Sequence, residues 1–157
     1  MDENTSRRKI GTTVTTKQYI VVNIGSERYG IDITYIDNIV RMQKITRVPK
    51  AQDYFKGVIN LRGEVVPVMS VRVRMGLAPD EYTNTSRIII IKLEQQGSIG
   101  LIVDEVQEVV TLDLNEIDRI SRDNTSTESF INGIGKHEGQ LISLLELQSV
   151  VAEKAVQ

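Results

Sequence analysis

The feature that most constrains this 157-residue chain is an internal duplication. When the chain is laid on itself at a constant offset, glycine falls on glycine and apolar residues fall on apolar residues. The pairing places Tyr29, Gly30, Ile31, Ile33, Ile36, Ile39 and Val40 on Ile99, Gly100, Leu101, Val103, Val106, Val109 and Val110. A repeat of this kind constrains the fold more than any local motif does.

A second pair of segments matches at a slightly longer offset. It places Gly57, Gly63, Val65, Val66, Val68, Met69 and Val71 on Gly133, Gly139, Leu141, Ile142, Leu144, Leu145 and Leu147. The change in offset implies one inserted loop, and the polar run from Ser121 to Ser129 is the obvious candidate. We therefore predict a tandem pair of small β-units.

Short runs of β-branched and aromatic residues, bounded by turn residues, predict the strands. These runs are 19–24, 29–33, 58–61 and 65–69 in the first half, and 88–93, 99–103, 131–134 and 141–145 in the second. Short strands at regular spacing favour barrels, so the predicted fold is mainly β. Gly25 and Gly63 mark tight chain reversals. Pro67 cannot donate to a ladder, which predicts an edge or bulged strand at that point.

We expect few helices, all of them short. Thr34 and Asp37 have the spacing of a helix cap, and the positions of Ile36, Ile39 and Val40 would line one helical face. Ser70 could cap a second helix that ends at Gly76. The stretch 146–154 predicts a C-terminal helix with three inward side chains, Leu147, Val150 and Val151.

The composition excludes several classes of protein. Lys and Arg (19) nearly balance Asp and Glu (21), so no overall basic field would recruit nucleic acid or an anionic membrane. Cysteine is absent, which excludes disulfides and thiolate chemistry. Residues 1–16 are polar and lack the apolar core of a signal peptide, so we expect a disordered tail on a cytoplasmic protein without membrane insertion.

No residues assemble a recognisable active site, and we expect neither catalysis nor a metal or cofactor. His137 is the single histidine and lies in a glycine-rich hairpin. Asp32, Asp104 and Glu105 could be imagined as paired carboxylates, but strand ends and caps explain them better. An oligonucleotide- or oligosaccharide-binding barrel is an alternative, although the 4% aromatic content gives it little support.

The block Gly57-Val58-Ile59-Asn60-Leu61-Arg62-Gly63-Glu64-Val65-Val66-Pro67-Val68 strongly resembles the CheW family. The likeness extends over residues 17–152, through 19–22, 29–33, 45–49 and 99–104. Related domains occur in the kinase CheA and in CheV, but this chain has no room for a kinase core or a receiver domain. It therefore looks like the free-standing adaptor.

The resemblance implies a CheW-like domain over residues 17–157, made of two repeats at approximately 17–83 and 84–157. It implies two five-stranded SH3-like or OB-like barrels related by a pseudo-twofold axis. It also implies a non-catalytic adaptor that couples the cytoplasmic tip of chemoreceptors to the regulatory domain of the histidine kinase CheA, in arrays associated with the membrane. Weak self-association within such arrays is a further interaction that the resemblance allows.

Receptor contact in the family is associated with the groove between the barrels. Carried over by position, the receptor-binding residues would be Ile36, Asn38, Gly57, Arg62, Val109 and Gly133. Five of them also have a structural explanation: Ile36 as core, Val109 as half-buried barrel, the two glycines for their backbone conformation, and Arg62 as a solvated charge. The family often carries an acidic residue where this chain has Asn38, so a neutral hydrogen bond is expected there in place of a salt bridge.

Overall fold

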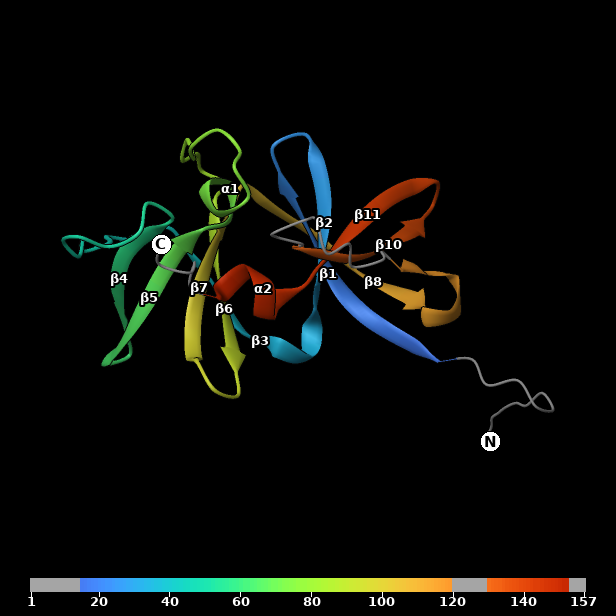
Figure 1. Ribbon diagram of the computed structural model, residues 1–157, viewed down its shortest axis with the longest axis horizontal. Coiled ribbons are helices and arrows are strands. Elements are labelled where there is room, and N and C mark those ends of the chain that lie inside the picture. Colours follow the sequence, from blue (N-terminus) through green and yellow to red (C-terminus); the bar gives the residue numbers. More distant parts are fainter. Residues whose placement is uncertain (1–14, 120–129, 153–157) are drawn as a thin grey trace, which may run out of the picture.

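The computed structural model describes residues 15–119 and 130–152. Figure 1 shows two β-sheets set side by side along the long axis of the molecule. The strands are β1 (Thr16–Ile24), β2 (Glu27–Asp32), β3 (Ile36–Arg41), β4 (Phe55–Leu61), β5 (Glu64–Ser70), β6 (Arg87–Leu93), β7 (Gly97–Val103), β8 (Glu105–Asp113), β9 (Asp118–Arg119), β10 (Ile131–His137) and β11 (Gln140–Leu145). Short helices are α1 (Val71–Arg74) and α2 (Leu147–Val151), with 3-10 turns η1 (Ile33–Tyr35) and η2 (Leu114–Glu116).

Each sheet takes strands from both halves of the chain. One sheet has the order β8-β1-β2-β11-β10-β9, and the other has the order β3-β6-β7-β5-β4. Strands of the two halves pair at four places: antiparallel between β1 and β8 and between β3 and β6, and parallel between β2 and β11 and between β5 and β7. Neither of the two sequence repeats could therefore form its sheet alone. The polar tail and the inserted loop lie largely outside the described residues, because β1 begins at Thr16 and the structure describes nothing between 119 and 130.

The strand register shows a pseudo-twofold relation between the sheets. Across one sheet, Asn38, Ile90, Gly100, Val68 and Gly57 pair in a continuous row. Across the other, the corresponding row is Glu108, Val21, Gly30, Leu144 and Gly133. The glycine pairs that the self-alignment equated thus occupy equivalent positions. The prediction of a mainly β protein in two similar halves is confirmed.

Both sheets curl toward barrels because the chain crosses back after β3 and after β8. Thr46 exchanges two backbone hydrogen bonds of 2.8 Å with Val58 of β4, and β9 pairs with β10 at Gly133 and Ile134. Within the described residues the first and last strands of each sheet do not pair, so the barrels are not closed by a complete ladder. The curvature is consistent with the SH3-like barrels that we predicted.

Three apolar clusters form the core. One fills the inside of each barrel: Tyr19, Val21 and Leu144 belong to the first, and Ile88 and Ile90 to the second. The third lies between the sheets and joins residues of β1 and β2 to residues of β6 and β7. Because both faces of β6 are covered, four consecutive isoleucines, 88–91, are all buried.

The helix predicted around Ile36 is wrong, and the segment forms strand β3 instead. Asp32 accepts hydrogen bonds from the backbone N–H and the hydroxyl of Thr34 and so caps the start of η1, which extends only to Tyr35. The register of β3 then shifts between Ile36 and Asn38, so one extra residue is inserted. This bulge places Ile36 and Ile39 on the same cluster although they are three residues apart, which imitates a helical spacing.

The other two short helices were predicted correctly in position. Ser70 accepts a hydrogen bond from the N–H of Val73 at 3.1 Å and donates one to Asp80, so it caps α1. Leu147 and Val150 of α2 are buried in the cluster between the sheets. Residues 153 and 154 of the predicted helix lie outside the described residues.

A buried arginine joins the two helices. Arg74 of α1 is 6% exposed and lies between the rings of Tyr54 and Phe130, 4.9 Å from each centroid. Its guanidinium donates to the carbonyl oxygens of Ser149, Val150 and Ala152 at 2.8 to 3.2 Å. It thereby caps the carboxyl end of α2 and fixes that helix to the rest of the fold.

The prediction of an edge at Pro67 holds only for that residue, since the strand as a whole, β5, lies between β4 and β7. The ladder with β7 begins only at Val68, one residue after the proline. The missing N–H is therefore tolerated because Pro67 pairs with β4 alone, opposite Val58.

Candidate interaction surface

Ile36 and Asn38, which sequence analysis placed on a helix, lie on β3 and are half-buried. Ile36 packs against the cluster between the sheets, in line with its structural explanation. The side-chain oxygen of Asn38 accepts a hydrogen bond from the N–H of Ile39 at 2.8 Å, beside the bulge. Its amide nitrogen is left to donate, so Asn38 can offer a neutral donor at this strand.

Gly57 and Gly133 occupy equivalent places where the chain crosses back over the sheet. Gly57 has a φ of 137°, and a Cβ there would overlap the carbonyl oxygen of Thr46. At Gly133 a Cβ would lie 2.8 Å from a methyl carbon of Ile117. Both residues are buried, so the backbone explanation accounts for them without a partner.

Arg62 and Val109 are exposed. Arg62 occupies the tip of the β4–β5 hairpin with a φ of 54°, followed by Gly63 with a φ of 81°. It forms no ion pair with any residue in 15–119 or 130–152, and Val65 beside it on β5 is 64% exposed. Val109 on β8 is 47% exposed, although its repeat counterpart Ile39 packs against the core.

The six predicted residues lie on strands of both sheets and on one hairpin tip. Asn38 and Gly57 share a cross-strand row but lie on its two outer strands. In Figure 1, β4 with Gly57 and β10 with Gly133 lie toward opposite ends of the long axis.

A small cavity of about 180 Å³ is shared by the two sheets, and none of the six predicted residues lines it. Lys17 and Asp32 form an ion pair of 3.0 Å at its wall. Their hydrogen bond raises the pKa of Lys17. Burial opposes ionisation of Asp32, but the hydrogen bonds from Thr34 and Lys17 outweigh it and hold the pKa of Asp32 below its ordinary value. These two residues serve the fold, as expected for a carboxylate at a strand end.

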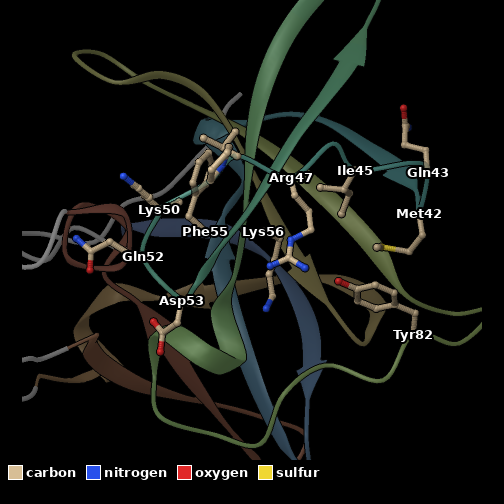
Figure 2. Close-up of a pocket in the computed structure, with 13 residues that line it drawn as sticks. Met42, Gln43, Ile45, Arg47, Lys50, Gln52, Asp53, Phe55, Lys56 and Tyr82 are labelled. Carbon is tan, nitrogen blue, oxygen red and sulfur yellow. The ribbon is translucent and has the colours of Figure 1, made fainter.

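A larger cleft lies beside the long connection between β3 and β4, and sequence analysis did not predict it. It encloses about 890 Å³. Figure 2 shows Arg47 and Lys56 extending into the same part of the cleft, with Met42 and Tyr82 on one side. We call this the basic cleft; it is lined by Met42, Gln43, Ile45, Arg47, Val48, Pro49, Lys50, Ala51, Gln52, Asp53, Phe55, Lys56 and Tyr82. The concentration of lysine and arginine in 41–56 was the signal that could have revealed it.

The titratable residues considered as candidates for chemistry are dispersed. His137 lies on β10, 3.6 Å from the carboxylate of Glu138, and Asp104 is engaged by Arg72. Within residues 15–119 and 130–152, histidine and acidic side chains do not gather into a group of three that could hold a metal ion. In the same part of the chain, none of the helices has the length and apolar character needed to cross a membrane.

Two curled sheets with a shared core and an open basic cleft define a β-barrel domain that works through its surface. The chain belongs to the CheW family, because the family model for the CheW-like domain matches residues 18–155. It is therefore a chemotaxis coupling adaptor, a scaffold and not an enzyme. The mainly β fold and the adaptor role inferred from the family resemblance of the block 57–68 are confirmed.

Several relatives support this assignment. The chemotaxis protein CheW of Bacillus subtilis is 35% identical over 144 residues, which is 91% of this chain and 92% of that protein. CheW of Helicobacter pylori is 31% identical over 134 residues, 85% of this chain and 81% of that protein. The crystal structure of the scaffolding protein TtCheW from Thermoanaerobacter tengcongensis matches with a TM-score of 0.76 and 33% identity, covering 84% of this chain and 90% of that one.

Proposed function

We propose that this adaptor couples the cytoplasmic tip of chemoreceptors to the histidine kinase CheA, and that it is thereby recruited to arrays at the membrane. The observation that carries the proposal is the match of the whole two-sheet domain to proteins named chemotaxis protein CheW. A coupling protein has to contact two partners at once, and a two-barrel scaffold offers separate surfaces for them.

Receptor contact uses the six residues carried over from the family, in two ways. Arg62, Asn38 and Val109 offer side-chain groups to a partner: an exposed guanidinium, a free amide donor and an exposed apolar surface. The guanidinium of Arg62 can fork onto a receptor carboxylate or a helix-end carbonyl. Ile36, Gly57 and Gly133 contribute by shaping the strands that carry these groups, since their side chains or backbones are at least half-buried.

Kinase contact uses the strand edges of the barrels. Among residues 15–119 and 130–152, the side of β4 away from β5 is engaged only by the bridge from Thr46 to Val58. Within that part of the chain the backbone of Ile59, Asn60 and Leu61 has no ladder partner on that side. A related barrel in the kinase regulatory domain could pack against such an edge, because like barrels associate pseudo-symmetrically through exposed strands.

The test is a titration of the adaptor against two separate proteins, a receptor-tip helical hairpin and the CheA regulatory domain, followed by addition of both together. We expect binding to each, and a ternary complex when both are present. Failure to bind either partner in a folded adaptor would refute the proposal. Binding to only one, or mutual exclusion of the two, would refute the coupling role.

A further inference from the structure

The connection between β3 and β4 carries a strong local charge. Residues 41–56 contain five cations, Arg41, Lys44, Arg47, Lys50 and Lys56, and one carboxylate, Asp53, in a chain whose formal net charge is -2. Within the described residues none of these cations forms an ion pair. Like charges held together without counter-charges repel one another. Binding of an anionic partner would relieve this repulsion, so the arrangement favours such a partner.

The cleft formed by this connection is built before any partner arrives. The two hydrogen bonds between Thr46 and Val58 fasten the middle of the connection to β4. Lys50 adopts a φ of 63° directly after Pro49, a conformation in which glycine or asparagine would be less strained. A lysine therefore occupies a backbone conformation that disfavours it, which suits a role for its charge.

The basic cleft also offers apolar contact. Val48 is 41% exposed and Tyr82 is 52% exposed, and both line the cleft together with Met42, Ile45 and Phe55. A cleft lined by cations and apolar side chains complements a segment that combines carboxylates with an apolar side chain. The carboxylates can pair with the cations, and the apolar side chain can pack against the apolar residues.

We propose that the basic cleft binds an acidic segment of a partner protein, with one apolar side chain of that segment packed against Val48 and Tyr82. Arg47, Lys50 and Lys56 supply the counter-charges. This inference rests on the proposed coupling function, because it takes the segment to belong to one of the two proteins that the adaptor joins.

A second copy of this chain is a less suitable occupant, although its β8 carries acidic residues. Glu105 accepts a hydrogen bond from Asn23 at 3.3 Å, and Glu108 lies 3.6 Å from Arg28. Asp113 accepts from the N–H of Asn115 at 2.9 Å and so caps η2. These carboxylates already have partners within their own chain, which lowers the gain from placing them in another copy's cleft.

The experiment compares the parent with Arg47→Glu/Lys56→Glu in titrations against the receptor-tip hairpin and the CheA regulatory domain. A matched control is Lys92→Glu/Lys136→Glu, which makes the same change of charge at two exposed lysines on other strands. We expect the cleft variant to lose about tenfold or more in affinity for one partner, more at about 0.05 M salt than at about 0.5 M, because screening shortens the reach of the charges. The control should bind as the parent does.

A second variant, Tyr82→Ser, should weaken the same complex at both salt concentrations, since apolar contact is not screened. Parent binding to both partners with no change in the cleft variant would overturn the inference and leave the coupling function intact. If the parent binds neither partner, both the inference and the proposed coupling function are wrong. If sedimentation shows that the cleft variant loses only self-association of the adaptor, the occupant is a second copy and the inference is wrong.

Discussion

The guanidinium of Arg72 and the carboxylate of Asp104 meet fork to fork, with Nη2 2.6 Å from Oδ2 and Nε 3.1 Å from Oδ1. Asp104 also accepts the N–H of Gly25 at 2.8 Å. One carboxylate thereby ties α1, the β1–β2 turn and the end of β7 together, across strands that belong to different sheets.

Replacing this carboxylate should weaken the fold in a pH-dependent manner. Burial opposes ionisation of Asp104, but the hydrogen bonds from Arg72 and Gly25 outweigh it and hold the pKa of Asp104 below its ordinary value. A depressed pKa in the folded state contributes stability above the unfolded pKa of about 4, and that stability is lost as pH falls through the folded pKa. We expect Asp104→Asn to lower the free energy of unfolding by about 1 to 2 kcal/mol at neutral pH.

Urea unfolding of parent and variant from neutral to acidic pH measures this difference, which should shrink below about pH 4. Asp37→Asn is the control, because Asp37 is exposed and has no bonding partner among the described residues. A difference between parent and Asp104→Asn that stays constant down to acidic pH would show that the ion pair does not stabilise the fold.

The two equivalent glycines should differ in their tolerance of alanine. At Gly57 the φ of 137° and the carbonyl of Thr46 both oppose a Cβ, whereas Gly133 has no positive φ and its nearest obstacle is a side-chain methyl of Ile117 in place of backbone. We expect Gly57→Ala to cost about 3 kcal/mol or more and Gly133→Ala about 1 kcal/mol. Denaturant midpoints measure both; equal costs would contradict the difference in their surroundings.

Arg74 should not tolerate lysine. A lysine ammonium cannot reach three carbonyl oxygens and lie flat between Tyr54 and Phe130 at the same time. We expect Arg74→Lys to destabilise the protein by about 2 kcal/mol. Thermal unfolding tests this, with exposed Arg41→Lys as the control that should change stability by no more than about 0.5 kcal/mol. A melting temperature unchanged in Arg74→Lys would show that the guanidinium is dispensable.

Arg62 should separate receptor binding from folding. Its side chain is exposed at the hairpin tip, so Arg62→Ala should change stability by no more than about 0.5 kcal/mol. Loss of a charge-assisted contact at an interface can cost about 2 kcal/mol, which is roughly a thirtyfold fall in receptor affinity. Binding to the kinase domain should persist because it uses another surface.

Titrations against the receptor hairpin and the kinase domain, with thermal melts alongside, test the Arg62 prediction. His137→Ala is the matched control, since His137 lies beside the tip of the equivalent hairpin and should leave both affinities unchanged. Unchanged receptor affinity in Arg62→Ala would show that Arg62 is a solvated charge and makes no receptor contact. A lower melting temperature together with weaker binding to both partners would also contradict a specific receptor contact, because it would show a loss of folding.

Local signals predicted eight strands correctly, because runs such as 88–93 and 141–145 are rich in β-branched or aliphatic residues and end at turn residues. They missed the two-residue strand β9, and they failed for β3 and β8, where a register shift follows Ile36 and another lies opposite Val21 and Val22. At a bulge, successive buried residues are three positions apart in the sequence in place of two. The spacing of apolar residues therefore no longer identifies a strand. The basic cleft was missed because the run of cations in 41–56 becomes a cleft only when the connection folds back onto β4.

The sequence by itself determined the duplication, the strand runs, the turn glycines and the family, since each depends on residue types at short or constant spacing. Only the tertiary structure decided which strands pair. Strands β1 and β2 join β11, and β6 and β7 join β5, because the parallel pairs bury both faces of the central strands in one shared core. Such long-range pairing depends on the total apolar area that the fold buries. The spacing of residues within one short segment does not specify that area.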